Sequence, residues 1–488
     1  MKDRTNTMWT FICNYLKVNS SSMISDSVVS KSYKDVYEIV DNMGKKLKET
    51  IPTRSKCAIL CDREFNTMLA VLSCWRAGCV PIILSKNYGI NHSKKIIAKS
   101  CPDIFITDND IICDELIPAS DFPIFSITRG EMTGVTCHIK VEVSLIDIAL
   151  IMFTSGTTGY PKGTMITEKG LIANVNDISG YFNINSKDKI LIARPLYHSG
   201  VFTGELLVSL LKGVNIHFLD QKYNPLLIIK ELENQEITVF GGTPTLLHHL
   251  VLFIKRMSKR LQIRVISISG ECLSGEVAKG IRSVFQSTII YHVYGLTEAA
   301  PRVSFLSPDL FDKYPESVGL PLSSVEVRIV DNSGNTLGPN IDGNLLVKGP
   351  NVMKGYYEDS SDDSIRDGWL WTKDIACRNN DGLIFIKSRA DEMIIKGGMN
   401  IYPREIEQVL LKNWEIRDII AYGIRKKEGM RIGINVVLSE NVQLDQREIM
   451  SICSNTLPLH LLPDEINVVE HIEKNASGKT VRPKYINK

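Results

Sequence analysis

The stretch FTSGTTGYPKGT, which runs from Phe153 to Thr164, combines hydroxyl side chains and glycines with a lysine directly after the apolar run IDIALIM. Backbone N–H groups and hydroxyls of such a loop can surround phosphate oxygens, since glycine permits close approach and Lys162 adds a positive charge. The usual GxxxxGK(S/T) pattern is not met, because Pro161 and Gly163 replace its second glycine and its hydroxyl residue. The stretch therefore predicts an anion-binding loop, and it disfavours an ordinary P-loop nucleotidase.

Three further glycine-containing loops, GGTP, SGECLSG and YGLTEAA, each follow a stretch that is typical of a buried strand. Between Ile148 and Gly295 such strands alternate with helix-like stretches, one of which is expected to begin with Thr243 as its cap and Pro244 in its first position. This alternation is typical of parallel βαβ units. Because open parallel sheets bind ligands at the carboxyl ends of their strands, we expect all four loops to form one site at a single sheet edge.

The regions on either side of this segment complete the predicted fold. Lys56–Leu84 predicts a strand, a helix and a second strand, whereas the alternating pattern after Pro301 predicts a small antiparallel region. The stretch PREIEQVLLKN then predicts a helix that opens a new domain. We therefore expect an α/β fold with two domains. Residues 1–390 would form a large N-terminal domain of layered α/β subdomains with a small antiparallel β region, and residues 391–488 a small, mobile α+β C-terminal domain.

Composition narrows the classes of function. The 57 basic and 55 acidic residues give a net charge of +2, which predicts no general binding to nucleic acid or to membranes. No apolar run reaches the roughly 18 residues that a membrane span needs, and MWTFICNYL near the start lacks a small-residue cleavage site. A soluble, cytoplasmic protein is expected. The 11 cysteines include no CxxC pair, so disulfides and a zinc site are not expected.

Five motifs in order resemble the adenylate-forming superfamily, which includes acyl- and aryl-CoA synthetases, luciferases and peptide-synthetase adenylation domains. They are FTSGTTGYPKGT, YGLTEAAP, DGWLWTKDIA, DGLIFIKSRADEMIIKGGMNIYPREIE and NASGKTVRP. The resemblance implies that a carboxylic acid attacks the α-phosphate of ATP, giving an acyl-adenylate and pyrophosphate, after which a thiol takes the acyl group and AMP leaves. It implies ATP, Mg²⁺, and either CoA or the phosphopantetheine of an acyl carrier protein as cofactors and partners.

The same resemblance implies roles for residues of the nucleotide site. Tyr294 would stack on adenine, Thr297 would contact the α-phosphate, and Glu298 would bind Mg²⁺, which prefers oxygen ligands. Asp374 and Arg389 match the family's ribose-binding acid and arginine, and a structural salt bridge is the alternative explanation for them. The remaining residues expected to bind the nucleotide are Thr154, Ser155, Gly156, Thr157, Thr158, Gly159 and Lys162 on the phosphates, with Gly270 and Glu271 beside them.

Residues near the C-terminus complete the implied mechanism. Lys479 matches the catalytic lysine that bridges the substrate carboxylate and the α-phosphate, so Lys479→Ala is expected to abolish adenylate formation and to spare ATP binding. Asp391 matches a hinge, and Gly397 and Gly398 would let the thiol arm pass after rotation. The chain departs from the family's pattern where it has TKD for Thr-Gly-Asp and SRAD for Gly-Arg.

The acyl pocket is less well defined by the sequence. His198 in PLYHSG resembles the histidine beside the pocket of acyl- and aryl-CoA synthetases, although a buried structural histidine is the alternative. No aspartate in ARPLYHSGVF could pair with an α-ammonium group, which disfavours amino acids, but Glu205 keeps that possibility open. The expected pocket residues are His198, Phe240, Gly242, Val293 and Ala299.

Three functions remain open at this level. An acyl- or aryl-CoA synthetase acting on a small-molecule carboxylic acid is the leading hypothesis. A stand-alone enzyme that loads a carrier protein is the second, because CoA and the carrier present the same thiol. A non-catalytic nucleotide-binding relative is the third, and it would have no need of Lys479.

Overall fold

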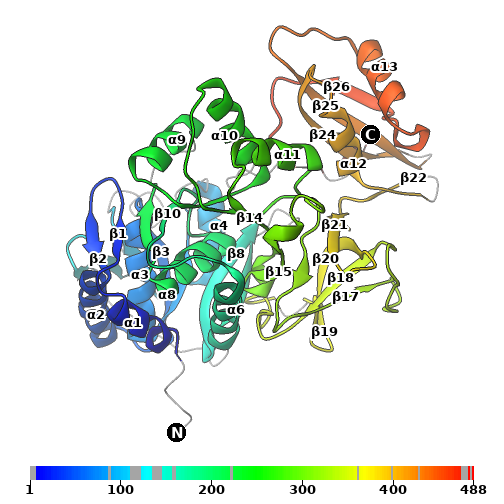
Figure 1. Cartoon of the computed structure of the whole chain (residues 1–488). Coiled ribbons are helices and arrows are strands. Elements are labelled where there is room, and N and C mark those ends of the chain that lie inside the picture. The colour runs from blue at the N-terminus through cyan, green and yellow to red at the C-terminus, as the bar shows by residue number, and fades with distance from the viewer. Residues whose placement is uncertain are drawn as a thin grey trace. The chain divides into compact units, whose positions relative to one another are not determined.

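The computed structural model describes residues 7–85, 90–109, 123–133, 145–155, 161–219, 224–359, 362–396, 399–426, 429–473, 482–483 and 486–487 (Figure 1). The chain divides into two compact units. The first comprises residues 1–327 and 347–370, and the second comprises residues 328–346 and 371–488. No helix in the described part of the chain is both long and apolar enough to cross a membrane.

A nine-stranded sheet forms one half of the first unit. Six of its strands, from β14 to β1, are parallel, and the strands beyond them on both sides are antiparallel. In sheet order the strands are β16 (Leu320–Pro321), β15 (Arg302–Leu306), β14 (Ile289–Gly295), β13 (Val265–Ile268), β12 (Val239–Gly242), β10 (Lys189–Ile192), β11 (Asn215–Phe218), β1 (Met23–Ser25) and β2 (Ser30–Ser32).

A seven-stranded sheet forms the other half, and it too is parallel in its centre. Its order is β7 (Glu131–Thr133), β6 (Ile124–Ser126), β5 (Ile104–Thr107), β3 (Lys56–Leu60), β4 (Val80–Ile83), β8 (Ile148–Ser155) and β9 (Pro161–Thr167). The edge strands β7 and β9 are antiparallel to their neighbours.

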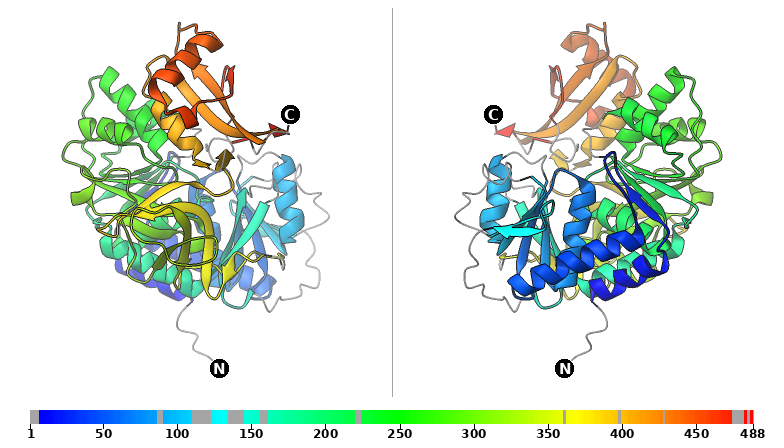
Figure 2. Two further views of the ribbon diagram at one scale, coloured as in Figure 1. Left: turned by 90° about the vertical axis from the view of Figure 1, so that its right-hand side faces the viewer. Right: turned by 90° about the vertical axis from the view of Figure 1, so that its left-hand side faces the viewer.

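Helices cover both sheets, and Figure 2 shows them from two further sides. Helix α3 is buried along nearly its whole length, and its side chains share one hydrophobic core with strands of both sheets. The helices that the structure describes in this unit are α1 (Met8–Val18), α2 (Tyr33–Thr50), α3 (Glu64–Ala77), α4 (Ile90–Ser100), α6 (Glu168–Tyr181), α7 (Ser199–Val201), α8 (Val208–Lys212), α9 (Pro225–Asn234), α10 (Pro244–Arg256) and α11 (Gly275–Val284). The unit also contains the π-helical turn η2 (Phe202–Leu207) and the 3₁₀ turns η3 (Thr297–Ala299) and η4 (Pro308–Leu310).

Local sequence rules explain where α10 begins. The Thr243 hydroxyl accepts a hydrogen bond from the backbone N–H of Leu246 at 3.2 Å, and Pro244 occupies the first helical position, where no N–H is required. The predicted start of this helix is therefore confirmed. The α/β fold class is confirmed as well, with its antiparallel region and its smaller C-terminal part.

One prediction about the sheets is wrong. The β8–β9 hairpin, where the phosphate loop is predicted, belongs to the seven-stranded sheet, because β8 pairs with β4, whereas the other three glycine-containing loops follow strands of the nine-stranded sheet. The four loops therefore do not share one sheet edge. Hydrophobic alternation indicates that a segment is a parallel strand, but it does not indicate which strand will be its neighbour.

The second unit is built mainly from antiparallel strands. A five-stranded sheet contains residues of both units, since β19 lies within residues 347–370 of the first. Its order is β17 (Glu326–Val330), β18 (Gly343–Lys348), β20 (Trp369–Arg378) and β19 (Ile365–Arg366), with β21 (Ile384–Arg389) paired to β20. A two-stranded ribbon, β22 (Ile394–Lys396) and β23 (Met399–Ile401), precedes a four-stranded sheet of β26 (Glu465–Val468), β25 (Gly429–Leu438), β24 (Ile416–Lys426) and β27 (Ile486–Asn487). Helices α12 (Pro403–Leu410) and α13 (Gln446–Thr456) pack on the last sheet through a common apolar core, and η5 (Leu459–Leu461) follows α13.

Candidate active site

The hairpin of β8 and β9 presents the predicted phosphate lysine. Thr154 and Lys162 face each other across the two strands, and the Thr154 hydroxyl lies 3.5 Å from the Lys162 carbonyl oxygen. A Cβ at Gly163 would lie 2.9 Å from the Phe153 ring, so this position cannot carry a side chain without displacing that ring. The predicted residues Gly156, Thr157, Thr158 and Gly159, and the side chain of Ser155, lie outside the described residues.

Lys162 is surrounded by side chains that sequence reasoning missed. Its Nζ lies 3.1 Å from Asp359 Oδ2, 3.9 Å from Asp362 Oδ1, and 4.4 Å from the centre of the Tyr356 ring. The run YYEDSSDD is visibly acidic in the sequence, but nothing local indicates its partner. The acidic run lies beside Lys162 because residues 353–357 extend along β9, where the Tyr357 N–H donates to the Gly163 carbonyl at 2.7 Å.

The turn after β14 carries Thr297 and Glu298 in η3. The Thr297 and Ser199 hydroxyls are 3.1 Å apart, and Glu298 Oε1 accepts a hydrogen bond of 2.7 Å from the Tyr356 hydroxyl. The backbone N–H of Met353 also donates to the Glu298 carbonyl, at 2.9 Å. The segment beside β9 therefore contacts both Lys162 and Glu298, and one side chain, Tyr356, touches these two groups of opposite charge.

The other predicted nucleotide residues of this unit follow β13 and end β14. Gly270 has a φ of +92°, a conformation that favours glycine. Glu271 Oε2 accepts hydrogen bonds from the N–H and the hydroxyl of Thr245, at 3.1 and 2.6 Å, where a carboxylate complements the N-terminal end of α10. Tyr294, the penultimate residue of β14, is half-buried.

The predicted acyl-pocket residues lie at or near the ends of β10, β12 and β14. The half-buried His198 precedes α7, and its ring centre lies 4.1 Å from that of Tyr197, whose pKa is raised to about 12 because burial disfavours the phenolate. Phe240, Val293 and Ala299 are buried, with 1%, 3% and 0% of their surface exposed. At Gly242, which ends β12, a Cβ would lie 3.0 Å from Leu247 Cγ. Whether these residues contact an acyl group stays a prediction.

Glu205, which left an amino acid substrate possible, is engaged elsewhere. The residue is 3% exposed, and its carboxylate accepts a hydrogen bond from Arg194, whose guanidinium also lies 3.4 Å from Ser269 Oγ. A Cβ at Gly241 would lie 2.2 Å from Glu205 Oε1, which shows how closely the carboxylate packs on β12. Because Arg194 already neutralises it, Glu205 is a poor partner for an α-ammonium group.

Glu205→Gln is expected to lower the free energy of unfolding by about 3 kcal/mol, because it leaves the guanidinium of Arg194 without its carboxylate in a largely buried place. Urea denaturation measures this change. Glu233→Gln is the matched control, since its pair with Lys259 is exposed and should contribute less than about 1 kcal/mol. Equal and small effects of the two substitutions would contradict a stabilising role for the buried pair.

In the second unit, Asp374 and Arg389 are cross-strand neighbours on β20 and β21. Arg389 Nη1 donates to Asp374 Oδ1 at 3.2 Å and to the Thr372 carbonyl at 3.0 Å, and Arg389 Nε lies 3.5 Å from Asp391 Oδ1. The structural salt bridge is thus present, and ribose binding by the pair stays a prediction. Gly397, Gly398 and Lys479 lie outside the described residues.

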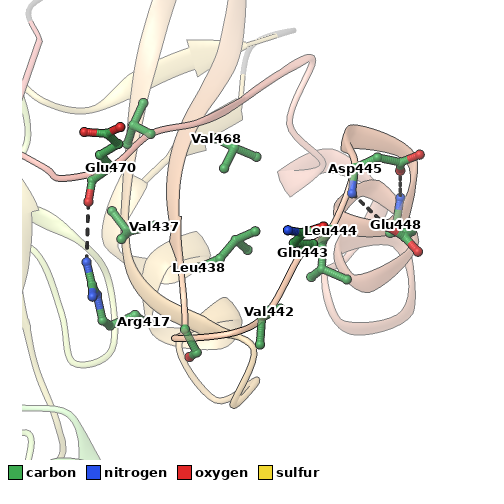
Figure 3. A pocket seen from close by; sticks show the side chains of 12 residues that line it. Arg417, Val437, Leu438, Val442, Gln443, Leu444, Asp445, Glu448, Val468 and Glu470 are labelled. Carbon is green, nitrogen blue, oxygen red and sulfur yellow. Dashed lines mark hydrogen bonds between the residues drawn. The ribbon is translucent and has the colours of Figure 1, made fainter.

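The second unit also has a shallow pocket of about 750 Å³ on its four-stranded sheet (Figure 3). Apolar side chains of β25, β26 and the segment before α13 line it, and Arg417 donates to the Glu470 carbonyl at its rim, at 3.4 Å. None of the predicted site residues is among the described residues that line it.

Comparison with known proteins identifies the class. Residues 16–357 match the family model of AMP-binding enzymes, and residues 405–479 match that of the AMP-binding enzyme C-terminal domain. The chain therefore belongs to the AMP-binding enzyme family, as the motifs indicate.

Individual relatives are more distant. A long-chain-fatty-acid–CoA ligase of Salmonella typhimurium is 30% identical over 358 residues, which are 71% of this chain and 62% of that protein, so the match spans less than two thirds of the relative. A 2-succinylbenzoate–CoA ligase of Bacillus licheniformis is 28% identical over 435 residues and 88% of each chain. The solved structure of o-succinylbenzoate CoA synthetase from Bacillus subtilis, in complex with its acyl-adenylate intermediate, superposes with a TM-score of 0.84 at 23% identity and covers 98% of this chain and 97% of that one. The two chains share the same fold.

Proposed function

We propose that the protein activates a carboxylic acid with ATP to an acyl-adenylate, releases pyrophosphate, and then transfers the acyl group to a thiol, which we take to be CoA. The observation that carries this proposal is the convergence of Lys162 and Glu298 on Tyr356 in the first unit. Phosphoryl transfer depends on positioning and on neutralisation of charge, which a lysine and a metal-binding carboxylate supply. The names of the relatives, which are CoA ligases, support CoA as the acceptor.

Each group has a task in the proposed reaction. Lys162 would neutralise the β- and γ-phosphates, and the Thr297 hydroxyl, which lies beside that of Ser199, would donate to the α-phosphate. Glu298 would hold Mg²⁺, and its carboxylate fits the oxygen ligands that this ion prefers. The ion would supply charge neutralisation on the leaving pyrophosphate.

The proposal also gives roles to residues of the second unit. Asp374 and Arg389 would bind the ribose, Lys479 would stabilise the charge that develops at the α-phosphate, and Asp391 would be the hinge between residues 1–390 and 391–488. Gly397 and Gly398 would then admit the thiol arm.

A cytoplasmic location belongs to the same proposal. The relatives act on long-chain fatty, succinylbenzoic and ferulic acids, so the substrate class extends over acyl and aryl acids.

The test is ATP–pyrophosphate exchange over a panel of aryl acids, short, medium and long acyl acids, and amino acids, with AMP release followed with and without CoA. We expect exchange with one class of acyl or aryl acid, and AMP release that depends on CoA. Exchange that ignores CoA would instead support a carrier protein as the acceptor. No exchange with any acid would favour a non-catalytic nucleotide-binding relative.

A further inference from the structure

Tyr356 contacts two charged groups that the proposed reaction uses for different purposes. Its hydroxyl donates to Glu298 Oε1 at 2.7 Å, and the centre of its ring lies 4.4 Å from Lys162 Nζ. Its position is set by the backbone, because Tyr356 forms an isolated β-bridge with Thr164 and the Tyr357 N–H donates to the Gly163 carbonyl. The side chain therefore reaches both groups from a segment anchored to β9.

The two contacts have distinct physical consequences. A hydrogen bond from a neutral phenol fixes the orientation of the Glu298 carboxylate without cancelling its charge, and it leaves Oε2 available to a cation. The aromatic face attracts the Lys162 ammonium while leaving its charge intact, unlike the carboxylate of Asp359, which lies 3.1 Å away. One tyrosine can thus hold the metal carboxylate and the phosphate cation in a fixed relation.

We propose that Tyr356 is a positioning residue for adenylate formation, which orients Glu298 toward Mg²⁺ through its hydroxyl and steers Lys162 toward the phosphates through its ring. This inference rests on the proposed function. At metal sites, residues that hydrogen-bond to a metal ligand hold that ligand in place, and their loss typically weakens metal binding about 10- to 100-fold. Tyr356 would have this function toward Glu298.

The neighbouring residue offers a matched control. The Tyr357 hydroxyl interacts with Lys56 Nζ at 2.8 Å, and its buried side chain packs in the core of the seven-stranded sheet. Tyr356→Phe and Tyr357→Phe therefore each remove one phenol hydroxyl from the same segment, but only the first removes a contact to Glu298.

The experiment follows ATP–pyrophosphate exchange as a function of Mg²⁺ concentration at saturating ATP and acid. For Tyr356→Phe we expect the half-saturating Mg²⁺ concentration to rise about tenfold and the maximal rate to be largely recovered at high Mg²⁺. Tyr357→Phe should keep the wild-type Mg²⁺ dependence. In a Glu298→Gln background, Tyr356→Phe should change the Mg²⁺ dependence no further, because the two residues would act through one contact. Tyr356→Leu, which also removes the ring, should in addition raise the KM for ATP.

A second readout separates failure of this inference from failure of the proposed function. Calorimetric titration of ATP into the wild type and into Tyr356→Phe, at low and high Mg²⁺, needs no acid and no turnover. Weaker binding by the variant at low Mg²⁺ alone would support the positioning role even if no acid on the panel reacts. An unchanged Mg²⁺ dependence in Tyr356→Phe, or an equal shift in Tyr357→Phe, would overturn it.

Discussion

Glu298→Gln should lower the rate of ATP–pyrophosphate exchange by about two orders of magnitude or more, since a metal ion contributes several kcal/mol of charge stabilisation. The substitution removes one negative charge and nearly no volume. The amide oxygen can still accept the hydrogen bond from the Tyr356 hydroxyl, and the backbone carbonyl can still accept that from Met353, so the turn should keep its place.

Steady-state exchange at several Mg²⁺ concentrations measures the effect of Glu298→Gln, and thermal unfolding shows whether the fold is retained. Glu326→Gln, an exposed carboxylate on β17, is the control and should exchange at the wild-type rate. A Glu298→Gln protein that is folded and nearly as active as the wild type would refute the metal-binding role of Glu298.

Gly295→Ala is the second substitution with a large expected effect. A Cβ at this position would lie 2.2 Å from the Pro301 carbonyl oxygen and 2.9 Å from its carbon, and backbone atoms cannot move aside as a flexible side chain can. The turn that carries Thr297 and Glu298 must therefore shift. We expect a loss of stability of about 1–3 kcal/mol from overpacking and a fall in exchange of about a hundredfold from the misplaced residues.

Gly280→Ala is the matched control for this prediction. It lies within α11, where the nearest atom to a new Cβ is 3.9 Å away, so it should be neutral or stabilise by about 0.5–1 kcal/mol. Denaturant unfolding and exchange assays on both variants make the comparison. Wild-type exchange in Gly295→Ala would show that the turn tolerates displacement and that its geometry does not limit the reaction.

Much of the fold follows from local patterns in the chain. The start of α10 at Thr243 and Pro244, the strands β12, β13 and β14, and the antiparallel character of the later strands all agree with the structure. These features depend on capping, on φ preferences and on periodicity, which act between residues close in sequence. The motifs predict the family because the chemistry of a site constrains residue types at short, fixed spacings, which are also local.

The candidate site was only partly predictable. The motifs predict Lys162, Thr297 and Glu298, and their roles stay predictions, whereas nothing in the sequence places Tyr356, Asp359 and Asp362 beside them although their acidic and aromatic character is plain. The missing information was that residues 353–357 lie along β9. Pairing of segments distant in the chain depends on total burial and hydrogen bonding, which no local pattern records.

The place of β8 in the seven-stranded sheet and the ion pair of Glu205 with Arg194 could not be predicted from local patterns either, because both depend on contacts of the folded chain. Residue types and their local spacing determined much of the secondary structure and the family of this protein, and they predict the phosphate loop. The folded chain established which strands are neighbours, which charges are neutralised and which side chain joins Lys162 to Glu298. The difference arises because capping and turn energies are local, whereas the free energy of packing belongs to contacts that form only when distant segments meet.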